Sequence, residues 1–251
     1  MTDSTGNPAL GAGGFLYGIY AWLAFIVCAL VALLCTVFVP GLDRRRRWVT
    51  FWARAPFPLA GIRVDVVGLD RIPAGSCVVV ANHASYLDGV LLQAYLPPRF
   101  SYVIKGEMKH APVIGFLLRR IGSKFVERFD TSGSARDARG LLKAAKAGES
   151  LAFFPEGTFT AEAGLRRFRR GAFAAAISAG VPLVPLGISG SRKILRAETV
   201  LPRHGHLQIH IFDPVPPDDP AFSDHHALSE KARQMILSVI DEPDGLSEPA
   251  E

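Results

Sequence analysis

A histidine and an aspartate lie five residues apart, just after an apolar run, and together they could perform acid–base chemistry. The run Cys77–Ala81 is predicted to be a buried strand, and it leads directly into Asn82, His83 and then Asp88. If His83 lies on a loop and Asp88 in the first turn of a following helix, the carboxylate can accept one ring N–H of the imidazole. The other ring nitrogen is then free to take a proton from a hydroxyl, as a general base does.

The same residues have an ordinary structural interpretation. Ser85 and Asp88 have the S-x-x-D spacing of a helix capping box, so the carboxylate could serve to close a helix end. His83 could be a core histidine that bonds to the backbone, and Asn82 could be a turn former. The spacing alone leaves both interpretations open.

Two more segments place polar groups where strands are predicted to end. The segment Pro155–Thr158 contains a proline and a glycine, which permit a tight turn. Such a turn can present backbone N–H groups and the Thr158 hydroxyl to an anion, or it can be a simple connection. The residues alone favour a surface ion pair of Arg128 with Glu127 or Asp130, although its planar guanidinium also suits a phosphate.

From residue 62 onward, short β-rich runs alternate with helical ones. This alternation predicts an α/β domain with a mixed, largely parallel sheet flanked by helices, in which ligands bind at the carboxyl ends of the strands. The expected strands are Arg63–Val67, Cys77–Ala81, Ser101–Ile104, Lys124–Glu127, Leu151–Phe154, Leu183–Leu186 and Leu207–Phe212. The expected helices are Leu87–Tyr95, Val113–Arg120, Ser134–Ala147, Gly171–Ala179 and Ala221–Ile240.

The amino-terminal segment is apolar enough to enter a membrane. Residues 4 to 42 carry no charged side chain, and a helix over Phe15–Val39 would be roughly 38 Å long, against a hydrocarbon core of ~30 Å. Arg44–Arg47 follow, and the positive-inside bias places the carboxyl side of the helix in the cytoplasm. A cleaved signal peptide would have a basic start and a shorter apolar core. We therefore expect a membrane-embedded anchor that either spans the membrane or enters it and returns.

The expected organisation has four parts. Residues 1–42 form the membrane anchor, residues 43–61 an amphipathic connector, residues 62–240 the α/β domain, and residues 241–251 an acidic, disordered tail. The connector contains Trp48, Phe51 and Trp52 and could lie on the membrane surface or be an ordinary packing helix.

Charge and cysteine content narrow the function classes. Lys and Arg number 28 against 23 Asp and Glu, which suits an anionic partner such as membrane lipid, a phosphorylated substrate or an acidic carrier protein. No motif supports binding to nucleic acid. The three cysteines contain no C-x-x-C pair, and no cluster of metal ligands is visible, so neither a disulfide scaffold nor a metal site is indicated.

Four blocks of the sequence resemble the motifs of the glycerolipid acyltransferase family, typified by 1-acyl-glycerol-3-phosphate acyltransferases. They are Asn82–Asp88 (the NH-x4-D motif), Gly122–Arg128, Phe154–Thr158 and Val181–Pro185. Their order along the chain, from about Val66 to Ser191, is that of the family. The resemblance implies transfer of a fatty acyl group from acyl-CoA or acyl-carrier protein to a lysophospholipid hydroxyl. The best candidate acceptor is 1-acyl-sn-glycerol-3-phosphate, which would give phosphatidic acid in phospholipid biosynthesis.

The resemblance also implies roles for individual residues. His83 would be the general base and Asp88 its partner, with direct attack by the acceptor hydroxyl and no covalent acyl-enzyme, cofactor or metal. The residues that would bind substrate are Lys105, Arg128, Glu156, Gly157 and Thr158.

One position departs from the family. Phe159 stands where members that act on lysophosphatidic acid often have arginine, so a phosphate contact is missing or supplied elsewhere. The nearby candidates are Arg166, Arg167, Arg169 and Arg170, which could instead meet anionic lipid or an acidic carrier protein, or form a solvated basic face. Another lysolipid or hydroxylated lipid is therefore an alternative acceptor.

Two other classes of function compete with acyl transfer. A lipid or thioester hydrolase would use water as the acceptor, but the sequence has no G-x-S-x-G nucleophile elbow. A lipid-binding module without catalysis would have no need of His83 and Asp88.

Overall fold

A seven-stranded sheet forms the centre of the molecule. The computed structural model describes residues 11–127 and 131–246, and the order of its strands is β1-β7-β6-β2-β5-β3-β4. They are Arg63–Val67 (β1), Val78–Ala81 (β2), Ser101–Lys105 (β3), Lys124–Val126 (β4), Leu151–Phe153 (β5), Leu183–Ser189 (β6) and His206–Ile211 (β7). Every neighbouring pair is parallel except β6 and β7, which are antiparallel. The expected mixed, largely parallel sheet is therefore confirmed.

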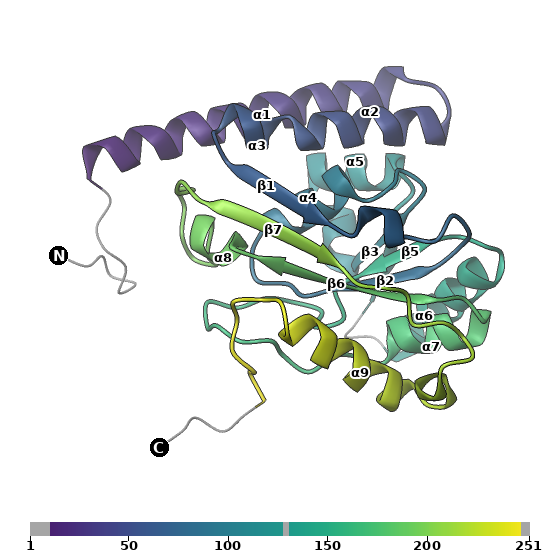
Figure 1. Ribbon diagram of the computed structural model, residues 1–251. Helices are drawn as coiled ribbons and strands as arrows, with labels where there is room; N and C mark the ends of the chain where they lie inside the picture. The colour runs from purple at the N-terminus through teal and green to yellow at the C-terminus, as the bar shows by residue number, and fades with distance from the viewer. Residues whose placement is uncertain (1–10, 128–130, 247–251) are drawn as a thin grey trace.

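Helices cover both faces of the sheet (Figure 1). One face packs against α4 (Leu87–Tyr95), α3 (Pro56–Leu59) and part of α1 (Ala12–Phe38). The other packs against α6 (Thr131–Lys146), α7 (Gly171–Ala179) and α9 (His225–Leu237).

Strand β2 shows why the central strands are apolar along their whole length. Val79 and Ala81 belong to the core on one side of the sheet, whereas Val78 and Val80 belong to the core on the other. All four side chains are buried, because alternate residues of a strand point to opposite faces and both faces are covered here. The strand that carries the candidate site is thus fixed from both sides.

Helix α1 lies beside α2 (Leu42–Arg54) on top of the domain (Figure 1). Its buried positions recur every three to four or seven residues, so they share one helical face. They are Gly18, Ala21, Cys28, Ala32 and Thr36, all small side chains that permit close packing. The rest of the helix exposes large apolar side chains, among them Leu16, Leu23 and Phe38. By length and composition α1 is apolar enough to cross a membrane.

The four arginines lie inside α2, which covers most of the expected connector at residues 43–61. Arg46 is buried and donates hydrogen bonds to the carbonyls of Ile121 (2.7 Å) and Arg99 (3.0 Å). Arg45 donates to the carbonyl of Arg120 at 2.7 Å. Successive helical residues are about 100° apart, so a run of four must turn some toward the domain. Only part of this charge therefore faces solvent.

The expected helix Ala221–Ile240 is shorter than predicted. Residues Pro220–Ser223 form a 3₁₀ turn, and α9 begins at His225 because the Asp224 carboxylate accepts the backbone N–H groups of His226 and Ala227. That cap closes the first turn and excludes the preceding residues from the helix.

The carboxyl-terminal segment is also more ordered than expected over residues 241–246. The Glu242 carboxylate accepts the N–H of Gly164 at 2.7 Å, and the Pro243 carbonyl accepts that of Leu165 at 2.8 Å. The prediction of disorder is wrong for these residues, because backbone and ionic contacts tie them to the domain. Residues 247–251 lie outside the described part of the chain.

The remaining elements are short. They are α5 (Pro112–Arg120), α8 (Ser191–Ile194) and the 3₁₀ turns Leu69–Arg71 and Gly106–His110.

Candidate active site

The structure brings His83 and Asp88 together at the carboxyl end of β2. His83 lies on the loop after the strand and Asp88 in the first turn of α4, as the spacing predicted. The imidazole Nδ1 is 3.0 Å from Asp88 Oδ2. The same oxygen accepts the backbone N–H groups of Ala84 (2.6 Å) and Ser85 (2.7 Å), and the Asp88 side chain has no exposed surface. The carboxylate is therefore held rigidly against the ring.

This network fixes the state of the imidazole. An ionised carboxylate has only acceptor sites, so the Nδ1 that faces Asp88 carries the proton. Nε2 is then the unprotonated nitrogen, with a lone pair able to take a proton from a hydroxyl. About a sixth of the His83 side chain remains exposed (17%), so the ring can meet a substrate.

The capping interpretation is met in part, because the Asp88 N–H donates to the Ser85 carbonyl and not to its hydroxyl. Besides the bond from the Ser85 N–H to Asp88, the Leu87 N–H donates to Ser85 Oγ at 3.1 Å. One carboxylate therefore both closes the start of α4 and contacts His83. The two readings of the sequence do not exclude each other.

Asn82 ties the histidine loop to the neighbouring strand β6. Its amide nitrogen donates to the Ile188 carbonyl at 2.9 Å, and its amide oxygen accepts the Ile188 N–H at 2.7 Å. A side-chain amide can form this pair because it carries both a donor and an acceptor, like a peptide group. Asn82 thus fixes the start of the loop that carries His83.

The Glu156 carboxylate is buried directly behind the histidine. One oxygen accepts the backbone N–H of His83 at 2.7 Å and the other accepts that of Arg166 at 2.9 Å. Burial raises the pKa of this carboxyl to about 7, and the nearby charge of Asp88 acts in the same direction. The sequence placed Glu156 among substrate-binding residues. In the structure both of its oxygens hold protein backbone, and a contact with substrate stays a prediction.

Aromatic rings enclose the imidazole, which the sequence did not predict. The His83 ring stacks on Phe154 with 4.1 Å between centroids, and Phe159 lies 4.5 Å away on a tilted plane. Phe159 also contacts the edge of Tyr86, with 4.7 Å between centroids. The residue that replaces the frequent arginine is therefore packed against the histidine. One indication of this packing was present in the sequence, because Phe154 and Phe159 lie on either side of the turn that contains Glu156.

The remaining predicted substrate-binding residues are Gly157, Thr158, Lys105 and Arg128. Gly157 adopts a positive φ of 84° in a turn, and its N–H donates to the Phe154 carbonyl at 2.9 Å, so this amide is already engaged. Thr158 is exposed, and its hydroxyl donates to the Phe159 carbonyl at 3.4 Å. Lys105 ends β3, two strands from β2, and lies 3.6 Å from Glu107. Arg128 lies outside the described residues.

The described residues contain no group of three or more His, Cys, Asp or Glu side chains that could hold a metal ion.

Comparisons with known proteins point to one family. A sequence model of the family described as Acyltransferase matches residues 63–189. The chain is 30% identical to a chloroplastic 1-acyl-sn-glycerol-3-phosphate acyltransferase of Brassica napus, over 83% of this chain and 64% of that protein. It is also 30% identical to 1-acyl-sn-glycerol-3-phosphate acyltransferase alpha of Homo sapiens, over 73% of this chain and 66% of that protein. The chain thus spans a little under two thirds of the length of these two relatives.

A solved structure has the same fold. The 1-acyl-sn-glycerophosphate (LPA) acyltransferase PlsC from Thermotoga maritima superposes with a TM-score of 0.74, covering 89% of this chain and 93% of that one, at 21% identity.

Proposed function

The chain belongs to the acyltransferase family, and from that premise we propose that it transfers a fatty acyl group from acyl-CoA or acyl-carrier protein to the hydroxyl of a lysophospholipid. The observation that carries the proposal is the contact between His83 and Asp88 at the end of β2. The names of the relatives make 1-acyl-sn-glycerol-3-phosphate the first acceptor to test, with phosphatidic acid as the product. Another lysolipid is the alternative acceptor, because Phe159 stands where the family often has an arginine.

The proposed mechanism needs no covalent acyl-enzyme. His83 Nε2 takes the proton of the acceptor hydroxyl while the oxygen attacks the thioester carbon, giving a tetrahedral intermediate. The intermediate collapses, the C–S bond breaks, and the departing sulfur takes the proton from the imidazolium. Asp88 stabilises the imidazolium between these two steps, since its carboxylate already accepts the Nδ1 hydrogen bond.

The surrounding residues support this chemistry by holding the ring. The Glu156 carboxylate accepts the backbone N–H of His83, and the Asn82 side chain ties the start of the histidine loop to Ile188 on β6. Phe154 and Phe159 limit the access of water to the imidazole. Exclusion of water favours transfer to an alcohol over hydrolysis of the thioester.

The contacts of α1 favour a helix that lies along the membrane over one that crosses it. Near its start, Tyr17 donates to the Ala60 carbonyl at 3.0 Å, and near its end Thr36 accepts a hydrogen bond from Arg120 at 2.8 Å. These residues are about 28 Å apart along the helix axis, nearly the thickness of the hydrocarbon core. If α1 crossed the membrane, the domain residues that form these polar contacts would have to lie inside the bilayer. We therefore propose that the exposed apolar face of α1 enters one leaflet.

The depth of one residue distinguishes the two arrangements. Ile26 lies near the middle of α1 and half of its surface is exposed. A fluorophore on Ile26→Cys, in a Cys35→Ser background, should lie roughly 5–10 Å into a lipid vesicle, as measured by quenching with lipids brominated at different depths. A position at the bilayer centre would contradict the surface arrangement. The cytoplasmic face stays our prediction, since both proposed acyl donors are cytoplasmic thioesters.

A panel of acceptors tests the activity itself. We expect the purified protein to convert 1-acyl-sn-glycerol-3-phosphate and a labelled acyl-CoA or acyl-carrier protein into a diacylated product, identified by mass. His83→Ala should lower the turnover number by about 10²–10⁴-fold with an unchanged melting temperature. Release of free fatty acid without a lipid product would show a hydrolase instead, and near-normal transfer by His83→Ala would refute the mechanism.

Asp88→Asn tests the partner of the base. The amide oxygen of asparagine can replace Oδ2 and accept its three N–H bonds, but it carries no charge and supports an imidazolium poorly, so transfer should fall strongly. Its NH2 group then takes the buried place of Oδ1, which has no hydrogen-bond partner among the described residues, so the free energy of unfolding should drop by about 1–3 kcal/mol. A loss of stability with a normal rate of acyl transfer would mean that Asp88 serves only as a helix cap.

A further inference from the structure

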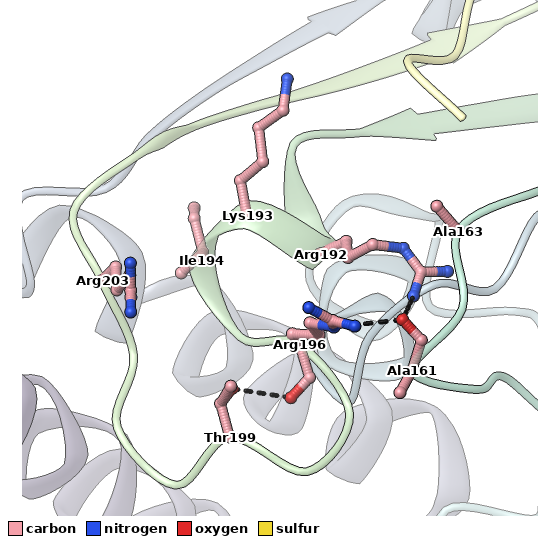
Figure 2. A pocket seen from close by; sticks show the side chains of 8 residues that line it. All are labelled: Ala161, Ala163, Arg192, Lys193, Ile194, Arg196, Thr199 and Arg203. Carbon is pink, nitrogen blue, oxygen red and sulfur yellow. Dashed lines mark hydrogen bonds between the residues drawn. The ribbon is translucent and has the colours of Figure 1, made fainter. Parts of the chain in front are cut away.

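A cationic cavity lies beside the candidate active site and is not used by the proposed mechanism. Its volume is about 270 Å³, and it lies between the segment after Phe159 and the chain that follows β6 (Figure 2). It is lined by Ala161, Ala163, Arg192, Lys193, Ile194, Arg196, Thr199 and Arg203. Four of these eight residues are basic and none is acidic.

Two of the basic side chains are held by acidic neighbours. Arg192 forms a largely buried ion pair with Glu242 at 2.6 Å, and it also donates to the carbonyls of Thr160 (2.7 Å) and Ala161 (3.1 Å). Lys193 is 2.7 Å from Asp241. These two residues therefore fix the wall of the cavity, and most of their charge is balanced.

Arg196 differs from them in having an unbalanced charge. Its Nε donates to the Ala161 carbonyl at 3.1 Å, which aims the guanidinium along the cavity wall next to that of Arg192 (Figure 2). Within the described residues, its two terminal nitrogens have no hydrogen-bond partner and no carboxylate lies within ion-pair distance. A planar guanidinium anchored through one nitrogen leaves a two-pronged donor for an oxyanion. The Arg203 guanidinium lies across the cavity from it (Figure 2).

The fold places this cavity near His83. β2 and β6 are parallel neighbours, so the loops after them leave the same edge of the sheet. Ser85 Oγ, on the histidine loop, donates to the Leu195 carbonyl at 2.6 Å, and Arg196 is the next residue. On the opposite wall, Ala161 follows two residues after Phe159, which contacts the His83 ring. Both walls of the cavity are therefore joined to the histidine loop through adjacent residues, so a substrate held at His83 can extend toward Arg196.

The size of the cavity limits what it can hold. Pockets that enclose a whole ligand of drug size measure roughly 300–1,000 Å³, so 270 Å³ suits a headgroup rather than a lysolipid or a whole acyl-CoA. The positive charge of the Arg196 guanidinium favours an anionic ligand. A phosphate suits it best, because it offers several acceptor oxygens to the two terminal nitrogens.

We propose that the cavity at Arg196 is a phosphate-binding site for one of the two substrates. This inference rests on the proposed acyl transfer. It supplies the phosphate contact that Phe159, in the place of the frequent arginine, cannot make. The phosphate belongs either to the acceptor lipid or to the nucleotide of acyl-CoA, and kinetics can separate the two.

The experiment compares phosphate-bearing and phosphate-free substrates. The variants are Arg196→Gln, the conservative Arg196→Lys, and Arg139→Gln as a control for the loss of one exposed arginine on α6, at the far end of the sheet (Figure 1). The acceptors are 1-oleoyl-glycerol-3-phosphate and 1-oleoyl-glycerol; the donors are oleoyl-CoA and S-oleoyl-N-acetylcysteamine. All variants should keep the melting temperature of the wild type.

Arg196→Gln should raise the KM of one phosphate-bearing substrate about 10- to 100-fold, with the KM of its phosphate-free counterpart unchanged. Arg196→Lys should recover part of this loss, and Arg139→Gln should behave as wild type. An effect confined to the lysophosphatidate assigns the site to the acceptor, and one confined to oleoyl-CoA assigns it to the donor. Equal effects on phosphate-bearing and phosphate-free substrates, or none, would overturn the proposal.

A binding measurement separates this proposal from the proposed function. Calorimetric titration of His83→Ala with glycerol 3-phosphate and with inorganic phosphate should give saturable binding that Arg196→Gln removes. This binding, together with a wild-type protein that transfers no acyl group to any acceptor, would sustain the phosphate site and refute the acyl transfer. Binding that survives Arg196→Gln would overturn the site.

Discussion

The imidazole of His83 is defined by its contacts on three sides. Asp88 holds Nδ1, Glu156 holds the backbone N–H of the same residue, and Phe154 and Phe159 lie against the ring. Each contact restricts a different freedom: the tautomer, the position of the backbone and the tilt of the ring. Substitutions of these neighbours should therefore impair different properties of His83.

Glu156 should make stability depend on pH. Its pKa is raised by burial from 4.5 to about 7, so the folded state binds a proton that the unfolded state has lost in this range. The contribution of this group is fully present below pH 4.5 and is lost as the pH rises through 7, by up to about 3 kcal/mol in the free energy of unfolding. Denaturant unfolding of wild type and Glu156→Gln between pH 4 and 8 measures it. A difference between the two proteins that does not vary with pH would contradict the assignment.

Phe159 should protect the reaction from water. Phe159→Ala removes a ring that contacts both His83 and Tyr86, so water can reach the imidazole. We expect a several-fold higher ratio of thioester hydrolysis to lipid product, measured as free fatty acid against diacylated lipid. Phe212→Ala, which removes a ring that contacts His210 instead, is the matched control. An unchanged ratio in Phe159→Ala would mean that other groups exclude the water.

At the scale of elements, the close fit of α1 against the domain depends on its small side chains. A Cβ added at Gly18 would lie 2.8 Å from the Cβ of Leu201, whereas one added at Gly13 meets nothing within 4 Å. Gly18→Val should lower the free energy of unfolding by about 1–3 kcal/mol, because the helix or the Leu201 loop must move. Gly13→Val, on the same helix, should change it by less than about 1 kcal/mol. Thermal unfolding of both variants in detergent compares them, and equal effects would mean that α1 packs differently.

The elements themselves were largely predictable from the sequence. The run Val78–Ala81 has no polar residue because both faces of the sheet are covered, and this made β2 and the loop after it recognisable. The start of α9 was missed because Asp224 was not recognised as a cap within the expected helix. The ordered segment 241–246 depends on Glu242 meeting Arg192 and Gly164, partners 50 and 78 residues away, which local composition cannot reveal.

The candidate site was predictable only where its residues are close in the chain. His83 and Asp88 are five residues apart, so their spacing limited the possible geometry. The packing of Phe159 on His83 and the meeting of Ala161 with Arg196 join distant segments, and no periodicity or motif reports them. The buried position of Arg46 was missed for the same reason, since its partners are supplied by the rest of the domain.

At the scale of the whole molecule, removing the anchor should have two effects. Deletion of residues 1–40 removes the exposed apolar face of α1, so the protein should leave lipid vesicles in a flotation assay, unless Trp48 and Phe51 on α2 hold it there. It also uncovers Phe57, whose ring packs edge-on against Phe25 of α1, so the shortened protein should melt at a lower temperature and aggregate.

A milder variant separates these two effects. Leu23 and Leu30 are both more than half exposed on α1, and changing both to lysine keeps the packed face intact. This double variant should lose vesicle binding with little change in melting temperature, whereas Leu69→Lys, a change of an exposed leucine in the 3₁₀ turn after β1, should bind normally. Retained binding by the double variant would place the membrane contact elsewhere on the molecule.

The segment between Arg196 and His204 touches α1 on one side and lines the cavity on the other. Trp22 donates to the Val200 carbonyl at 2.5 Å and Tyr17 stacks on His204, while Arg196, Thr199 and Arg203 face the cavity. If α1 lies in the outer part of a leaflet, the cavity lies beside the headgroups of that leaflet, so an acceptor lipid can react while its acyl chain stays in the bilayer. Catalysis would then follow the mole fraction of acceptor in the bilayer, and diluting the acceptor with inert lipid at constant bulk concentration should slow the reaction in proportion.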